Sequence, residues 1–185
     1  MEKGLTVRKI VVAGVLGAVA ILLGVTRLGY IPVPTAAGNA TIMHIPAIIG
    51  GILQGPLVGL IIGLIFGITS FLNATIPLFK DPLVAILPRL FIGVTAYLAY
   101  RGIRNINEYV AVGIASFVGS ITNMALVLIM AVIRGYLAPG VAWAVALTNG
   151  IPEAVVSVVI TLAAVAAWMK IGHWGRRKSK ISEDM

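Results

Sequence analysis

Long uncharged segments dominate this chain and determine the solvent in which it folds. The segment Val110–Ile133 contains no charged residue, and a helix needs about 20 apolar residues to cross the hydrocarbon core of a bilayer. Hydrophobic residues make up 59% of the sequence and charged residues only 11%, unlike the composition of soluble domains. Because lipid offers no hydrogen bonds to the backbone, segments of this length are expected to be helical. The sequence therefore predicts an all-α membrane protein.

The positions of charges, prolines and glycines predict a compact bundle of six transmembrane helices. The second predicted helix is short and, at about 1.5 Å per residue, covers only part of the bilayer. We expect a single domain, 1–173, followed by a basic cytoplasmic tail, 174–185. The predicted helices are Ile10–Leu28, Ile42–Leu53, Leu57–Leu72, Leu83–Tyr100, Val110–Ile133 and Gly150–Met169.

Basic residues gather before the first, after the fourth and after the sixth predicted helix. Lys and Arg are enriched on the cytoplasmic side of membrane proteins, so both termini are predicted to be cytoplasmic. A secretory signal is the alternative for the first segment, but no soluble domain follows it, and we expect a helix. The net charge of +8 then reflects topology and contact with anionic lipid, and no binding of nucleic acid is expected. The basic residues concerned are Lys3, Arg8, Lys9, Arg101, Arg104, Lys170, Arg176, Arg177, Lys178 and Lys180.

Glycines at intervals of four residues mark the third predicted helix, at Gly55, Gly59, Gly63 and Gly67. Glycine inside a helix costs about 1 kcal/mol relative to alanine, so the pattern needs a compensating contact. In lipid, small residues let helix backbones approach closely, and the glycines predict a groove for a neighbouring helix. A backbone surface that touches a ligand is the alternative. We expect Gly67→Leu to harm folding or binding and Gly55→Ala to be mild.

Arg89 is the side chain that lipid should exclude most strongly. It follows Pro88 inside the fourth predicted helix, and an ionisable residue at membrane depth is a candidate functional site. Pro88 removes a backbone donor and frees the carbonyl of Val84, which predicts a kink beside the arginine. Glu153, expected in the first turn of the sixth helix, is the natural partner. The two residues either form a structural ion pair or contact a ligand.

Further polar side chains are expected near the outer face, whereas the inner halves of the helices have almost no polar side chains. This distribution predicts a shallow cavity open to the outside. Alternatively, His44 is an interfacial residue and Asn123 a bridge between helices. Tyr30 and Trp143, predicted in outer loops, either anchor the chain at the interface or stack on a planar ligand. The candidate substrate-binding residues are Arg89, Glu153, Asn123, Asn149, Asn39, Thr41, His44, Asn73, Tyr30 and Trp143.

Motifs for enzymatic chemistry are missing from the sequence. It contains no Gly-x-x-x-x-Gly-Lys-Ser/Thr loop for ATP, no His-Glu-x-x-His metal pair and no Gly-x-Ser-x-Gly turn. His44 and His173 lie far apart in the sequence, and there is no cysteine, so we predict neither a metal site nor a cofactor. The chain is not expected to be an enzyme.

Three stretches carry a family resemblance: ATIMHIPAIIGGILQGPLVGLIIGLIFGITSFLNA, DPLVAILPRLFIGV and TNGIPEAVV. In their order and spacing they resemble the substrate-binding S components of energy-coupling factor (ECF) transporters, especially the pantothenate-type branch. The resemblance implies a six-helix protein of a prokaryotic cell membrane, with a vitamin-sized site near the outer face under the loops after helices one, three and five. It also implies docking on a transmembrane coupling protein driven by two ATPase subunits, which accounts for the missing ATP motif.

The first helix of S components docks on the coupling protein through an Ala-x-x-x-Ala pattern of small residues. The matching positions here are Ala13-x-x-x-Gly17 and, one residue on, Gly14-x-x-x-Ala18. Both pairs keep a small, flat helix face. Packing within the bundle is the alternative for these residues.

A high-affinity binding subunit for a small water-soluble vitamin is the leading functional hypothesis. Pantothenate is the first candidate, because its carboxylate would pair with Arg89 and its hydroxyl and amide groups would suit Asn123, Asn149 and Glu153. Riboflavin, folate, pyridoxine or a thiamine precursor are alternatives within the family. Alternatives from other classes are an autonomous secondary transporter or channel, and a structural membrane protein in which Arg89 and Glu153 join two helices.

Overall fold

Helices make up nearly all of the regular structure in the computed structural model, which describes residues 6–32 and 39–183, with side chains placed for residues 6–30 and 41–170. A ribbon of two strands forms the only sheet in these ranges. In chain order the elements are α1 (Val7–Val25), β1 (Tyr30–Pro32), β2 (Asn39–Thr41), α2 (Ile45–Gln54), α3 (Pro56–Leu72), the 3-10 helix η1 (Pro77–Lys80), α4 (Pro82–Ala85), α5 (Leu87–Ile103), α6 (Glu108–Ile133) and α7 (Pro139–Glu183).

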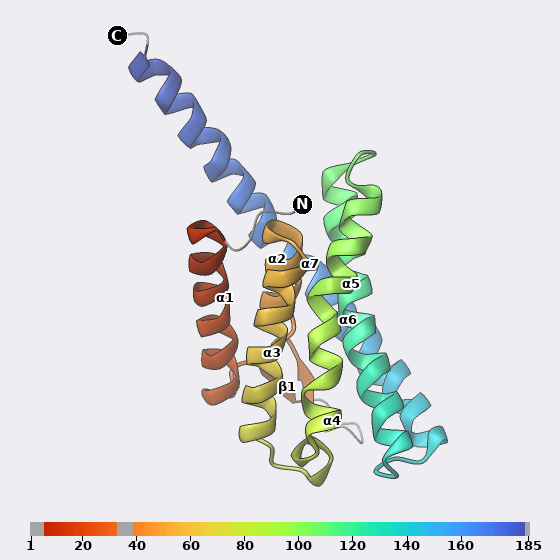
Figure 1. Ribbon diagram of the computed structural model, residues 1–185. Coiled ribbons are helices and arrows are strands. Elements are labelled where there is room, and N and C mark those ends of the chain that lie inside the picture. The colour runs from red at the N-terminus through yellow and green to blue at the C-terminus, as the bar shows by residue number, and fades with distance from the viewer. Residues whose placement is uncertain (1–5, 33–38, 184–185) are drawn as a thin grey trace.

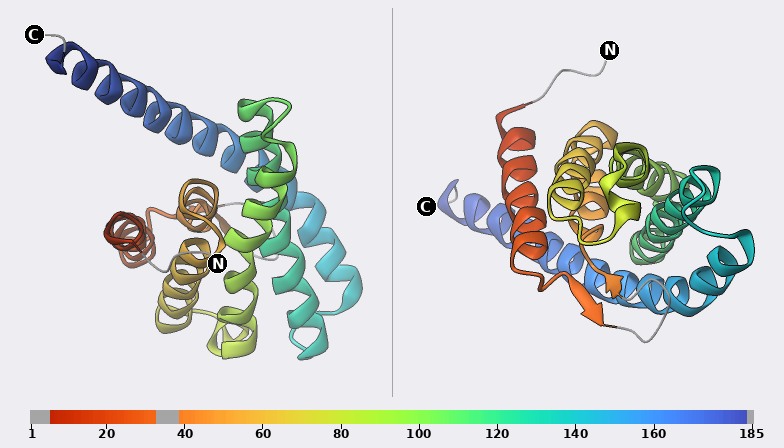
Figure 2. Two further views of the ribbon diagram at one scale, coloured as in Figure 1. Left: turned by 45° about the horizontal axis from the view of Figure 1, so that its top comes forward. Right: turned by 90° about the horizontal axis from the view of Figure 1, so that it is seen from below.

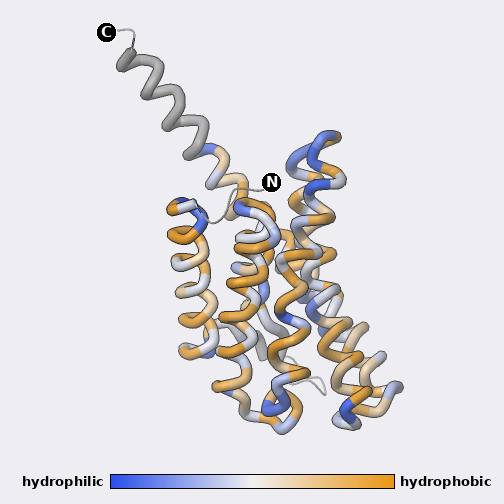
Figure 3. Tube along the Cα trace, viewed as in Figure 1, coloured by the Kyte–Doolittle hydropathy of each residue, from blue (hydrophilic) through white to orange (hydrophobic). Residues whose placement is uncertain are grey.

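The helices run back and forth through one bundle, and α1 begins on the side where α7 ends (Figure 1). When α4 and α5 are taken as one interrupted span, Pro82–Ile103, four spans in the described ranges are long and apolar enough to cross a membrane, and α2 and α3 are shorter. Apolar residues follow the helices, while polar residues gather at the helix ends (Figure 3). The predicted helical membrane bundle with a short second helix is thus confirmed. The positive-inside rule assigns the shared side of the termini to the cytoplasm.

The last helix is much longer than predicted, because α7 begins at Pro139 rather than at Gly150. Proline suits the first turn of a helix, and Pro139 takes that position. Pro152 lies inside α7, where it removes one backbone hydrogen bond. The prediction that Glu153 lies in the first turn is therefore wrong, and the helix dipole does not stabilise its carboxylate. Trp143 lies within α7 rather than in a loop.

The fourth span is interrupted at Ile86, between α4 and α5. Pro88 lies in the first turn of α5 and has no amide hydrogen to donate to the Val84 carbonyl. The kink predicted beside Arg89 is therefore a break between two helices. The start of α4 is as expected for an aspartate cap, because Asp81 accepts a hydrogen bond of 3.0 Å from a first-turn amide.

The segment after α1 forms an antiparallel ribbon that was not predicted from the sequence. β1 pairs with β2 in a register that sets Tyr30 opposite Thr41. The ribbon lies toward the side of the bundle opposite the chain ends (Figure 1), and β2 packs against α7. It therefore carries loop residues to the outer end of the bundle.

Close backbone packing joins α3 to α5 and accounts for most of the glycine pattern. A Cβ added to Gly59 would lie 2.8 Å from the Cα of Gly93 on α5, and one added to Gly63 would overlap the carbonyl of Arg89. A Cβ added to Gly67 would lie 2.9 Å from the Cα of the residue at the α4–α5 break. The predicted helix groove is confirmed at these three glycines, since only a missing side chain permits this approach.

Gly55 differs from the other three glycines because it separates α2 from α3. Its φ angle of +101° is a conformation that side-chain-bearing residues rarely adopt. The expectation that Gly55→Ala is mild is therefore wrong on backbone grounds, although in the described part of the chain no atom lies within 4 Å of the added Cβ.

α1 lies at the edge of the bundle (Figure 2) and has two different faces. Ala13 and Gly17 are buried, and a Cβ on Gly17 would lie 2.7 Å from the Ile65 side chain of α3. By contrast, no atom of the described residues lies within 4 Å of a Cβ added to Gly14, and Ala18 is exposed. The first pair packs within the bundle, and only the second pair faces outward.

Candidate functional site

Arg89 lies inside the bundle beside the α4–α5 break, with 3% of its surface exposed. Its guanidinium donates to the Val84 carbonyl, the group that Pro88 leaves without a helical donor. The ring centres of Phe66 and Phe79 lie 5.4 and 5.1 Å from the guanidinium carbon. Arg89 is thus held by a carbonyl and two aromatic faces, none of which neutralises its charge. Its Nε has no hydrogen-bond partner among the described residues.

Glu153 does not form an ion pair with Arg89. The only ion pair in the described part of the chain joins Arg134 to Asp81. Glu153 Oε1 instead accepts a hydrogen bond of 2.6 Å from the backbone amide of Thr41, which ties α7 to β2. Arg89 and Glu153 are nevertheless close enough to interact electrostatically. Burial of two charges without direct pairing is costly.

His44 and Tyr30 complete the surroundings of Arg89. His44 is fully buried just before α2, and neither ring nitrogen has a partner among the described residues. Tyr30 is half-buried on β1; burial raises the pKa of its phenol, while the positive charge of Arg89 opposes that rise. The charge of Arg89 also acts on His44. The ribbon, α2, α5 and α7 therefore bring polar groups around one buried cation.

Asn123 and Asn149 lie in adjacent turns of α6 and α7, and each is 4% exposed. A Cβ on Gly150 would overlap the side chain of Met124, so these turns touch. Asn149 Oδ1 accepts a hydrogen bond of 3.2 Å from the Thr148 hydroxyl, but Asn123 Oδ1 has no partner among the described residues. Buried polar atoms without partners are rare and are typical of places where a ligand or ordered water binds.

Three predicted site residues lie apart from these groups or outside what is described. The side-chain amide of Asn73 donates to the Thr69 carbonyl at 3.0 Å and caps its own helix. Trp143 is 70% exposed on α7, as expected of an anchor at the membrane interface. Asn39 begins β2, and its side chain lies outside the described residues.

The two rings around Arg89 were not predicted from the sequence. Phe66 belongs to α3 and Phe79 to η1, and both elements precede α5 in the chain. Each has mostly apolar neighbours in the sequence, where a phenylalanine is common. No local signal distinguishes such a ring from an ordinary core residue.

Buried hydroxyls between α6 and α7 were also missed. Ser116 Oγ lies 2.9 Å from Ser157 Oγ and 3.0 Å from Thr161 Oγ1, and all three residues are fully buried. The expectation that the inner halves of the helices have almost no polar side chains is wrong at this contact. A usable signal was present in α7, where polar residues recur every fourth position, which is one face of a helix. Those residues are Asn149, Glu153, Ser157 and Thr161.

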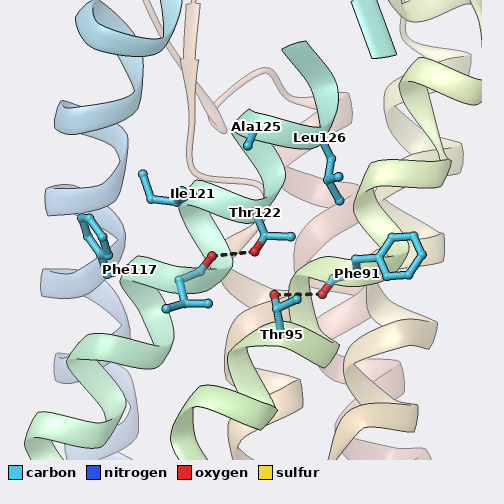
Figure 4. Close-up of a pocket in the computed structure, with 8 residues that line it drawn as sticks. Phe91, Thr95, Phe117, Ile121, Thr122, Ala125 and Leu126 are labelled. Atoms are coloured by element: carbon cyan, nitrogen blue, oxygen red, sulfur yellow. Dashed lines mark hydrogen bonds between the residues drawn. The ribbon is translucent and has the colours of Figure 1, made fainter. Parts of the chain in front are cut away.

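The described residues offer an apolar groove of about 480 Å³ between α5 and α6, and no group of three or more acidic or histidine side chains that could hold a metal. The hydroxyls of Thr95 and Thr122 donate to carbonyls of their own helices, at 3.0 and 2.8 Å (Figure 4). Phe91 and Phe117 in this groove are 45% and 51% exposed. With no free polar group, the groove suits lipid chains and not a water-soluble ligand.

Comparison with known proteins identifies the family to which this chain belongs. Residues 8–165 match the family described as "ECF transporter, substrate-specific component". The pantothenic acid transporter PanT of Lactococcus lactis subsp. cremoris (strain MG1363) is 30% identical over an alignment of 157 residues, which covers 70% of this chain and 78% of that protein. The family match contains α1 through α6 and most of the membrane part of α7. The chain therefore belongs to the family of substrate-specific components of ECF transporters, which are membrane transport proteins.

Proposed function

We propose that this protein binds pantothenate at the outer side of the membrane and delivers it to an ECF importer. The observation that carries the proposal is the buried guanidinium of Arg89, which has no carboxylate partner in the described part of the chain. A carboxylate ligand supplies that missing counterion. The similarity to a protein named as a pantothenic acid transporter favours pantothenate among the carboxylates.

The chemistry of the neighbouring groups suits a ligand with one charged and one uncharged end. A carboxylate at Arg89 engages N–H groups that the Val84 carbonyl and the two rings leave free. Glu153 repels an anion, so it belongs beside hydroxyl or amide donors of the ligand. His44 adds two buried ring nitrogens that have no partner among the described residues. Pantothenate carries a carboxylate, an amide and two hydroxyls and matches this division.

Isothermal titration of the purified protein tests the proposal. The panel consists of pantothenate, riboflavin, folate, pyridoxine and thiamine, each measured with the wild type, Arg89→Ala and Arg101→Ala. Arg101 is an exposed arginine on the same helix and serves as the matched control. We expect pantothenate to bind, Arg89→Ala to weaken binding at least about thirtyfold, and Arg101→Ala to have no effect. Binding of a different vitamin, or of none, would contradict the assignment of pantothenate.

A transmembrane coupling protein and two ATPase subunits are the proposed partners. The outward pair on α1, Gly14 and Ala18, provides a small, flat helix face on which another helix can pack closely. Ala13 and Gly17, the alternative docking pair, are occupied by contacts within the bundle. We therefore assign docking to the Gly14–Ala18 face.

A further inference from the structure

The unpartnered atoms of the site continue inward beyond Asn123. Ser120 lies three residues earlier on α6, is 1% exposed, and has no hydrogen-bond partner for its hydroxyl among the described residues. Residues three apart lie on the same side of a helix, so both open groups face the same helix contact. Leaving a buried hydroxyl unpaired has a free-energy cost. A group that the described chain does not supply would remove that cost.

Contacts between α6 and α7 set Ser120 level with Glu153. Ser116 bonds to Ser157 across this contact, and the two helices run antiparallel (Figure 1). One turn along α6 from Ser116 toward the outer side reaches Ser120. The corresponding turn back along α7 from Ser157 reaches Glu153. Ser120 therefore lies at the inner edge of the polar cluster that surrounds Arg89.

The hydroxyls further inward are already satisfied. Ser116 has one proton, which it donates to Thr161 at 3.0 Å. Ser157 must therefore be the donor in the contact of 2.9 Å between Ser157 and Ser116. These three hydroxyls bond to one another, and Ser120 is the next buried hydroxyl of α6 toward the outer side and has no partner in the described structure.

We propose that Ser120 determines ligand specificity by hydrogen-bonding the hydroxyl-bearing end of an elongated ligand whose carboxylate lies at Arg89. The inference rests on the proposed function and adds a residue and a ligand chemistry to it. Asn123 Oδ1 and the Glu153 carboxylate can only accept hydrogen bonds, so this end of the site requires donors. A ligand with an apolar end leaves these buried groups unpaired and binds more weakly.

Paired binding measurements test the role of Ser120. The probes are pantothenate and N-(3,3-dimethylbutanoyl)-β-alanine, which keeps the carboxylate and the amide but lacks both hydroxyls. We expect the wild type and the control Ser116→Ala to prefer pantothenate, and Ser120→Ala to lose about tenfold of that preference, because affinity for the analogue barely changes. An unchanged preference in Ser120→Ala would overturn the inference.

Thermal unfolding without ligand separates a failure of this inference from a failure of the proposed substrate. Ser120 has no partner among the described residues, and Ser120→Ala removes an unpaired buried hydroxyl, so this variant should unfold at or above the wild-type temperature. Ser116→Ala, which breaks two hydrogen bonds, should unfold at a lower temperature. If no variant binds pantothenate while Ser120→Ala stays fully stable, the substrate is wrong and the open hydroxyl is supported. An equal loss of stability in the two variants would show that Ser120 is structural and would overturn the inference.

Discussion

A guanidinium between two aromatic rings keeps its charge available to a ligand. The rings of Phe66 and Phe79 interact with Arg89 without supplying an anion. A carboxylate pairs with arginine in the plane of the guanidinium, through its N–H groups. Ring contacts and carboxylate binding are therefore compatible, and the rings contact a cation that has no ion-pair partner among the described residues.

Replacing Phe79 should therefore weaken binding without unfolding the protein. Phe79 is half-buried on η1, and Phe79→Leu keeps most of the apolar volume but removes the π face. We expect pantothenate affinity to fall about threefold to thirtyfold, the range that a cation–π contact provides. Phe117→Leu, at an exposed ring of the lipid-facing groove, is the control. Equal affinities for the two variants would show that Phe79 does not position Arg89.

At the scale of elements, the spans were predictable because apolar length and charge are local properties of the sequence. The break in the fourth span followed from Pro88, whose missing donor acts on its own helix. The start of α7 was not predictable in the same way, because a proline is tolerated both at a helix start and inside a membrane helix. In the structure Pro139 begins α7 and Pro152 lies inside it.

In the candidate site, too, features that depend on the local sequence were predictable, and features that depend on contacts between distant segments were not. Arg89 was recognisable because a charge at membrane depth is expensive whatever surrounds it. Of the two alternatives for Arg89 and Glu153, the structural ion pair is not observed, because Glu153 bonds to Thr41 on a ribbon that was not predicted from the sequence. Ser120 escaped notice because only the fold shows that its hydroxyl lacks a partner. Which groups meet depends on helix register, and register is set by packing between distant segments.

The contact between α3 and α5 makes Gly63 intolerant of any side chain. A Cβ there would overlap the carbonyl of Arg89, and overpacking of this kind costs about 1–3 kcal/mol. We expect Gly63→Ala to lower the unfolding temperature in detergent and to weaken pantothenate binding, since the backbone that carries Arg89 must shift. In Gly113→Ala the nearest atom would lie at an ordinary 3.8 Å, so this control should resemble the wild type. A fully stable Gly63→Ala would mean that the two helices separate at no cost.

The ion pair between Asp81 and Arg134 joins the start of α4 to the end of α6 and should make stability depend on pH. Arg134 Nε lies 2.6 Å from Asp81 Oδ2, and its hydrogen bond holds the pKa of Asp81 below the ordinary value. The unfolded carboxyl titrates at a higher pH than the folded one. The contribution is therefore fully present above about pH 4 and is lost as the pH falls through the lowered pKa.

Comparison with Asp81→Asn measures this contribution. We expect the wild type to unfold at a higher temperature than the variant at neutral pH, and the difference to shrink in acid. Arg134→Gln, which removes the same ion pair from its other partner, should reduce the pH dependence in the same way. A difference between the wild type and Asp81→Asn that persists into strong acid would exclude the ion pair as its cause.

On the scale of the whole molecule, ligand binding and proposed docking use separate parts of the fold. The candidate site gathers residues of the ribbon, α2, α5, α6 and α7. The outward face of α1 belongs to a helix at the edge of the bundle (Figure 2), whose inner face packs mainly on α3 and α2. Substitutions on that outward face should therefore affect transport without affecting binding.

Gly14→Leu and Gly17→Leu separate docking from packing on the same helix. A Cβ added to Gly14 would lie more than 4 Å from every atom of the described neighbours, whereas a Cβ added to Gly17 would lie 2.7 Å from the Ile65 side chain. We expect Gly14→Leu to retain the wild-type unfolding temperature and pantothenate affinity but to lose uptake by vesicles that contain the coupling protein and its ATPases, because the flat face is blocked. Gly17→Leu should instead lower stability. Normal uptake by a stable Gly14→Leu protein would exclude this face of α1 as the docking surface, since a leucine cannot be accommodated where two helix backbones must meet.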